Sequence, residues 1–174
     1  MRAIYFIVES LIGVFQVLLL LRLLMQLARA DFRNPIGRGI VQITDPVIRP
    51  LRRVFPPAGK VDTASILALV IVSAAKVWIL HLLLGAGFAQ PVFMARQVPL
   101  DLARLVLKTY LFSIILNAIL SFVAPGSYSP AQSILASICD PVLKPFRRII
   151  PAVAGLDLSP LWACIVIQAL LLVI

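Results

Sequence analysis

Two stretches of the sequence combine closely spaced basic residues with apolar neighbours, a pattern suited to binding an anionic surface. The basic residues are Arg49, Arg52 and Arg53 in the first stretch and Lys144, Arg147 and Arg148 in the second. They alternate with apolar residues such as Val47 and Phe55. A segment of this kind sinks shallowly into a membrane while its guanidinium groups reach lipid phosphate. The open alternative is that these charges only set the topology of a membrane protein.

The two stretches are copies of one motif. The first reads Asp-Pro-Val-Ile-Arg-Pro-Leu-Arg-Arg-Val-Phe-Pro over residues 45–56, and the second reads Asp-Pro-Val-Leu-Lys-Pro-Phe-Arg-Arg-Ile-Ile-Pro over residues 140–151. The shared prolines and aspartates are Asp45, Pro46, Pro50, Pro56 and Asp62, which recur 95 positions later as Asp140, Pro141, Pro145, Pro151 and Asp157. That many coincidences at one offset indicate internal duplication.

Each proline and aspartate has a predicted structural role. Asn34-Pro35 and Ser129-Pro130 are typical of an N-cap followed by proline in the first turn, so a short helix is expected after each. Apolar residues at positions 36, 40 and 43, and at 131, 135 and 138, give these short helices an amphipathic stripe suited to the membrane interface. We expect the second proline of each motif to prevent a long helix. The four aspartates are expected to cap helices rather than act as catalytic carboxylates.

Four apolar segments flank the motifs and have close to the length of a membrane span, which is about 20 residues. They are residues 3–27, 64–88, 98–123 and 158–174, of which the last is short. We call the connection between the first two the first basic loop, and the connection between the last two the second basic loop. The sequence therefore predicts an all-α membrane protein with about four transmembrane helices, arranged as two tandem, parallel helix–loop–helix repeats of residues 1–94 and 95–174.

Composition agrees with a membrane protein. Of the 174 residues, 61% are hydrophobic and only 13% are charged, whereas about a quarter of a soluble domain is charged. The net charge of +9 comes largely from the two basic loops. The positive-inside rule places both loops in the cytoplasm and both termini outside. Nucleic acid, the usual partner of a basic soluble protein, is not expected to bind directly.

Ionisable residues within the spans form a second candidate site. Glu9 and Arg22 lie in the first span, and Lys76 lies in the second. Charge within a span is costly and usually faces the interior of a helix bundle. We predict that Glu9 and Lys76 pair with each other. The functional alternative is an ion or proton path through Glu9, Gln16, Lys76 and His81.

The sequence offers no recognisable catalytic or cofactor site. His81 is the single histidine, and Cys139 and Cys164 form no CxxC pair. A Gly-rich phosphate loop, a Ser-His-Asp set and metal-ligand spacing are all missing from the sequence. We therefore expect a protein that is not an enzyme and needs no cofactor.

The motif Asp-Pro-Val-x-x-Pro-x-Arg-Arg-x-x-Pro resembles that of the YggT family of bacterial membrane proteins, also called YlmG-like. The resemblance covers nearly the whole chain in its two-copy form, although Asp62-Thr63-Ala64-Ser65 departs from the usual Asp-x-Ser-Pro. It implies a multi-pass protein of the bacterial inner membrane, and the termini that the positive-inside rule places outside are then expected in the periplasm. The family has no settled biochemical activity. Plastid relatives are linked with cytochrome complex maturation and nucleoid distribution, and bacterial members with osmotic tolerance and the neighbourhood of cell-division genes.

Two functions are in competition. The first is a non-enzymatic inner-membrane scaffold or assembly factor, whose two basic cytoplasmic loops dock anionic phospholipids or a partner. That partner would be another membrane protein or a second copy of the chain. The alternative is a small ion or solute pathway, or an accessory subunit, involved in osmotic adaptation. Glu9, Arg22 and Lys76 would matter most for the alternative.

Overall fold

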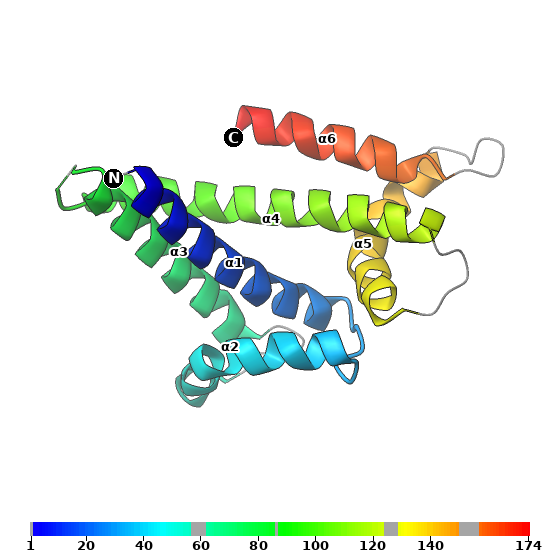
Figure 1. Ribbon diagram of the computed structural model, residues 1–174, viewed down its shortest axis with the longest axis horizontal. Coiled ribbons are helices and arrows are strands. Elements are labelled where there is room, and N and C mark those ends of the chain that lie inside the picture. The colour runs from blue at the N-terminus through cyan, green and yellow to red at the C-terminus, as the bar shows by residue number, and fades with distance from the viewer. Residues whose placement is uncertain (1, 57–61, 86, 124–128, 150–156) are drawn as a thin grey trace. The chain divides into compact units, whose positions relative to one another are not determined.

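The computed structural model describes residues 2–56, 62–85, 87–123, 129–149 and 157–174, and within these ranges the chain is helical without a strand (Figure 1). The helices are α1 (Arg2–Leu27), α2 (Pro35–Val54), α3 (Thr63–Leu83), α4 (Pro91–Val123), α5 (Pro130–Ile149) and α6 (Ser159–Val173). The predicted all-α class is confirmed.

Three helices, α1, α3 and α4, are long and apolar enough to cross a membrane. Helix α3 ends at Leu83, earlier than the expected residue 88, because Gly85, which follows the C-cap residue Leu84, adopts a positive φ angle of 73° that terminates a helix. Helix α4 has 33 residues and is therefore about 50 Å long, so it must tilt or extend beyond a hydrocarbon core of about 30 Å. Helix α6 has only 15 residues, and its role as a further span stays a prediction.

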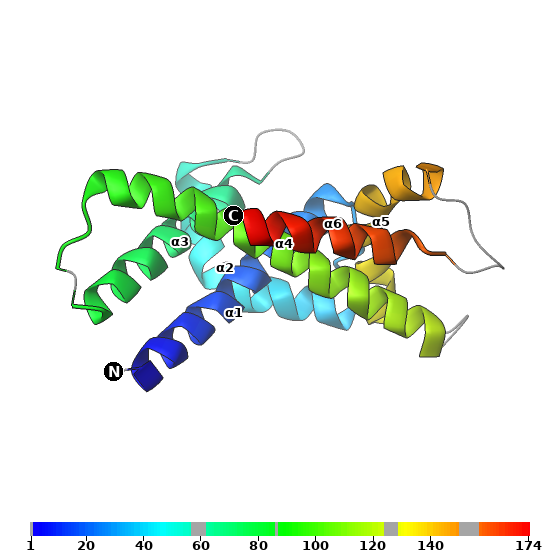
Figure 2. The same ribbon diagram turned by 90° about the horizontal axis from the view of Figure 1, so that it is seen from above.

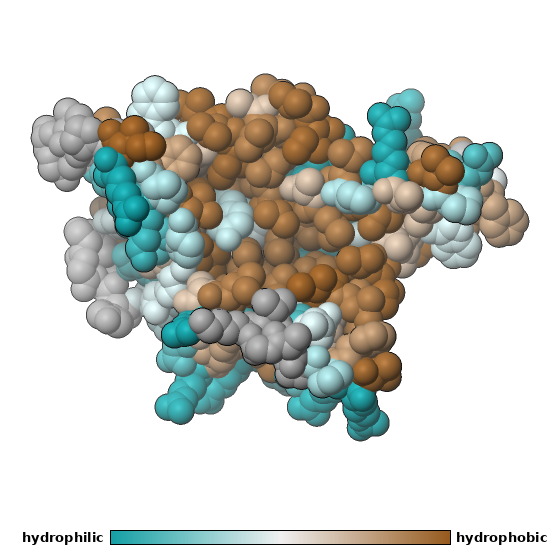
Figure 3. Space-filling model, turned by 180° about the vertical axis from the view of Figure 1, so that it is seen from behind, coloured by the Kyte–Doolittle hydropathy of each residue, from teal (hydrophilic) through white to brown (hydrophobic). Residues whose placement is uncertain are grey.

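The surface of the helices suits lipid rather than water. Figure 3 shows a face dominated by hydrophobic residues, with hydrophilic side chains gathered at its edges. Large apolar side chains such as Phe6, Phe112 and Leu172 are exposed. Extensive exposed apolar surface is an aggregation liability in water but is the normal outer surface of a transmembrane helix. The chain is therefore a membrane protein.

Helices α2 and α5 are continuous over 20 residues each, although each contains two prolines. The prediction that the second proline would prevent a long helix is wrong. A proline inside a helix removes one N–H donor and leaves one carbonyl without its partner. Pro46 and Pro50 lie four residues apart on the exposed side, as do Pro141 and Pro145. Because the unpaired carbonyls lie on this outer side, water or lipid headgroups can satisfy them.

The helices pack into two compact units, which we describe separately. The first comprises Met1–Leu23 and Ile40–Leu105, and the second comprises Leu24–Gly39 and Val106–Ile174. In the first unit α2 lies across one end of α1 and α3 (Figure 1). In the second unit α4, α5 and α6 contribute Ile114, Cys139, Leu143, Ala163 and Ile167 to one buried cluster. Figure 2 shows the ribbons of these three helices. The repeat boundary expected at residues 94 and 95 stays a prediction.

Candidate functional site

Helices α2 and α5 begin as the sequence predicts. The side-chain oxygen Oδ1 of Asn34 accepts a hydrogen bond of 2.7 Å from the backbone N–H of Gly37. Ser129 Oγ likewise accepts one of 3.1 Å from the backbone N–H of Gln132. Each bond satisfies a helix-terminal donor that has no partner within the helix. The predicted N-caps of both helices are confirmed.

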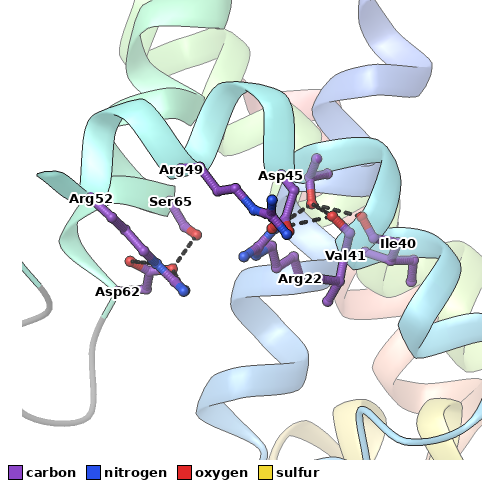
Figure 4. A network of polar contacts seen from close by, with 9 residues as sticks. Arg22, Ile40, Val41, Asp45, Arg49, Arg52, Asp62 and Ser65 are labelled. Atoms are coloured by element: carbon purple, nitrogen blue, oxygen red, sulfur yellow. Dashed lines mark hydrogen bonds and ion pairs between the residues drawn. The ribbon is translucent and has the colours of Figure 1, made fainter.

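Arg22 of α1 anchors α2 in the first basic loop (Figure 4). Its Nη1 donates to Thr44 Oγ1 at 2.7 Å and to Asp45 Oδ1 at 2.8 Å. Arg22 and Thr44 are both buried. A buried guanidinium is stable only when it is paired and hydrogen-bonded. Arg22 therefore fixes the position of α2 against α1.

Asp45 contacts both the buried Arg22 and an exposed arginine of α2. Its Oδ2 accepts a hydrogen bond of 2.9 Å from Arg49 Nε, one helical turn further on. Burial alone would raise the pKa of Asp45, but the hydrogen bonds and charges of Arg22 and Arg49 outweigh it and hold the pKa below its usual value. Because Asp45 lies inside α2, the prediction that it caps a helix is wrong.

A second carboxylate, Asp62 at the start of α3, connects α3 to the last turn of α2 (Figure 4). It forms an ion pair with Arg52 and accepts a hydrogen bond of 2.8 Å from Ser65 Oγ, and its side chain is 0% exposed. The opposing effects of burial and of these two partners leave the pKa of Asp62 below its usual value. Its hydrogen bond in turn raises the pKa of Arg52. Asp62 is the N-cap residue of α3, as predicted, but its carboxylate makes no capping bond to a backbone N–H.

The second basic loop contains a related but more exposed network. Arg147 donates from Nε to Asp157 at 2.9 Å and from Nη1 to Asp140 at 2.8 Å. Lys144 pairs with Asp140 at 3.0 Å and, through its hydrogen bond, is the main reason that the pKa of Asp140 is lowered. Asp157 Oδ1 accepts a hydrogen bond of 2.9 Å from the backbone N–H of Ser159, although Leu158 rather than Asp157 is the N-cap residue of α6. Asp140 lies inside α5, so its predicted capping role is wrong.

The ion-pair networks of the two basic loops differ in burial and in their arginines. Asn117 stands 95 positions after Arg22, so the second sequence copy lacks the buried arginine. Arg147 instead bridges two aspartates, and the side chain of Asp157 is 44% exposed. The first network is therefore the more strongly buried of the two.

The structure divides the six predicted basic residues by their contacts. Arg52 and Arg147 each form an ion pair with the aspartate at the end of their basic loop, Asp62 and Asp157 respectively. Arg49 and Lys144 are exposed, and among the described residues each pairs with an aspartate of its own helix, an ion pair that contributes little to stability. Arg53 and Arg148 are exposed and make no ion pair with any residue that the structure describes. Pro151, also predicted as part of the motif, lies outside the described residues.

A buried polar cluster connects three helices of the first unit. Lys76 of α3 forms an ion pair with Asp101 of α4 and donates at 3.0 Å to Gln16 Oε1 of α1. The amide nitrogen of Gln16 donates to Asp101 at 2.8 Å and to Ser73 Oγ at 2.6 Å. Each polar group thus has a partner inside the cluster, which favours structural pairing over an ion path.

The predicted pairing of Glu9 with Lys76 is therefore wrong. Glu9 is exposed on α1, and Lys76 is satisfied by Asp101 and Gln16. Asp101 was missed at the sequence level. It is the sole acidic residue of the expected span 98–123, and this is the signal that identifies it as a counter-ion for Lys76.

The thiols show no sign of reactivity. Cys139 of α5 is buried, and burial raises its pKa to about 12. A thiol becomes a nucleophile or metal ligand as the thiolate, so this residue acts as a small apolar group. Among the described residues, no three His, Cys, Asp or Glu side chains group as metal ligands.

These observations define a helical membrane protein whose basic loops are held by internal ion pairs. A family model described as CCB3/YggT matches residues 1–83 and 97–174, and the chain belongs to this family. The YggT resemblance of the motif is confirmed.

The chain is similar to three uncharacterized bacterial proteins along most of its length. It is 35% identical to YggT of Escherichia coli over 161 residues, which is 92% of this chain and 83% of that protein. It is 38% identical over 164 residues to a protein of Vibrio alginolyticus, covering 92% and 87%. It is 36% identical over 166 residues to a protein of Pseudomonas aeruginosa, covering 94% and 83%. No solved structure matches the chain significantly.

Proposed function

We propose that this protein is a non-enzymatic scaffold or assembly factor of the bacterial inner membrane, which docks anionic phospholipid or a membrane-protein partner through its two basic cytoplasmic loops. The observation that carries the proposal is the pair Arg53 and Arg148. Both are exposed without an ion pair among the described residues, and each is followed by an exposed apolar residue, Val54 or Ile149. A cation beside an apolar side chain suits the boundary between headgroups and hydrocarbon.

The neighbouring ion pairs give these cations a defined position. Arg52 is held by Asp62, and Arg147 is held by Asp140 and Asp157. A side chain on a fixed backbone loses less conformational entropy when it binds a ligand. The surplus of Lys and Arg in these loops supports a cytoplasmic location, where anionic lipid headgroups lie.

The test replaces both arginines that have no ion pair among the described residues, as Arg53→Gln/Arg148→Gln. We expect the affinity of the purified full chain for phosphatidylglycerol to fall about fivefold for each cation that contacts lipid, because each contributes about 1 kcal/mol. Native mass spectrometry of the protein in neutral detergent, titrated with phosphatidylglycerol, measures the change.

The matched control is Arg2→Gln/Arg96→Gln, which removes the same charge from exposed positions outside the basic loops. This control should bind phosphatidylglycerol like the wild type. Equal losses in both variants would show that only total charge matters, and no loss in either would remove the lipid form of the proposal. A co-purifying membrane protein lost only from the loop variant would identify the occupant as protein instead.

A further inference from the structure

Helix α2 has three distinct faces, and only one of them packs inside the first unit. Ile40, Thr44 and Ile48 follow each other at intervals of four residues and are buried. Residues at this spacing lie on one side of a helix. This face holds α2 against the rest of the unit, with Arg22 bonded to Thr44.

A second face of α2 is apolar and exposed. Ile36, Ile43 and Val54 are 42%, 53% and 69% exposed. Their spacings of seven and eleven residues place them on one line along the helix. Because α2 is connected at both ends to apolar spans and is anchored to α1, this line of side chains lies within reach of the bilayer.

The third face of α2 is basic. Arg38, Arg49 and Arg53 are all exposed and, at spacings of eleven and four residues, share one side of the helix. Arg49 is 78% exposed. A cationic face beside an exposed apolar face is the arrangement of a helix that lies in the plane of an anionic membrane surface.

Helix α5 does not repeat this arrangement. The residues 95 positions after Ile36, Arg38 and Ile43 are Ala131, Ser133 and Ile138. Ile138 is only 1% exposed, in contrast to Ile43. Among the α5 residues that correspond to the exposed apolar face of α2, only Ile149 is both large and exposed.

We infer that α2 is the membrane-surface helix of this protein, with Ile36, Ile43 and Val54 in the hydrocarbon and Arg38, Arg49 and Arg53 on the phosphates of anionic phospholipids. This inference rests on the proposed function and assigns the larger share of its lipid contact to the first basic loop. Helix α5 makes the smaller share, through Arg148 and Ile149.

The test compares two variants that remove equivalent charges. Arg49→Gln/Arg53→Gln changes α2, and Lys144→Gln/Arg148→Gln changes the positions 95 residues later in α5. Each variant removes one cation paired within its helix and one free cation. We expect the α2 variant to bind phosphatidylglycerol about 25-fold more weakly than the wild type and the α5 variant only about fivefold more weakly, through the loss of Arg148.

The outcomes separate the inference from the proposed function. A loss confined to α5, or equal losses in the two variants, would overturn the assignment to α2 and leave loop docking intact. No loss in either variant would overturn both.

A depth measurement tests the placement of the apolar face independently. Nitroxide labels at Ile43→Cys and Arg38→Cys, in a chain with Cys139 and Cys164 replaced by alanine, are compared in phosphatidylglycerol nanodiscs. We expect the label at position 43 to collide with dissolved oxygen and the label at position 38 with an aqueous nickel chelate. Equal nickel access at both positions, or oxygen exclusion at position 43 by a protein contact, would contradict a helix lying in lipid.

Discussion

Replacing Lys76 with leucine is expected to lower the stability of this protein by about 3 kcal/mol, because it leaves the carboxylate of Asp101 buried without its cation. The side chains of Lys76 and Asp101 are only 13% and 17% exposed. Removal of one partner from a buried pair leaves an uncompensated charge, which costs more than the pair itself contributes. The midpoint of thermal unfolding in detergent, followed by tryptophan fluorescence, measures the loss.

The control removes the three long polar side chains of the cluster as Gln16→Leu/Lys76→Leu/Asp101→Leu and leaves the small hydroxyl of Ser73. Leucine already stands 95 positions after Gln16 and Lys76, at Leu111 and Leu171, where it packs against the buried apolar cluster of the second unit. We therefore expect the triple variant to unfold within about 1 kcal/mol of the wild type. Lys76→Leu with wild-type stability, or a triple variant as unstable as the single one, would show that the cluster is not a closed ion pair.

The second large effect is expected at Asp62. Asp62→Ala removes the partner of Arg52 and of Ser65 from a fully buried position and should destabilise the protein by about 2 kcal/mol. Asp157→Ala is the matched variant, because Asp157 contacts Arg147 as Asp62 contacts Arg52. Its side chain is 44% exposed, so water replaces the contact with Arg147, and the loss of the bond from the backbone N–H of Ser159 brings the expected cost to about 1 kcal/mol.

Thermal unfolding of the two alanine variants under identical conditions compares these costs. A larger loss for Asp157→Ala than for Asp62→Ala would contradict the burial difference between the two networks. Equal losses would show that the first basic loop is hydrated around Asp62.

The fold class and the main apolar helices are predictable from the sequence because they depend on local properties. Runs of apolar residues predict α1, α3 and α4, and the Asn34 and Ser129 caps locate the starts of α2 and α5. The sequence does not predict the continuity of α2 and α5, because a proline is expected to break a helix wherever it occurs in the interior. Its cost depends on which side of the helix loses the hydrogen bond, and that is known only from the packing.

The basic loop residues are also recognisable from sequence, but their separate roles are not. Arg52 and Arg53 are neighbours with the same side chain, yet only Arg52 reaches Asp62. The pairing depends on how the chain returns from α2 to α3. The partner of Lys76 was missed for the same reason, since Asp101 approaches it from a third helix.

The central claim is that both basic loops face the same cytoplasmic compartment, and membrane-impermeant thiol labelling tests it most directly. Arg53→Cys and Arg148→Cys are introduced separately into a chain without Cys139 and Cys164, with Arg2→Cys as a marker for the outer side. We expect positions 53 and 148 to react in inside-out vesicles and to stay unreactive in intact spheroplasts, whereas position 2 should react in spheroplasts and not in inside-out vesicles. Labelling of positions 53 and 148 from opposite sides of the membrane would contradict it.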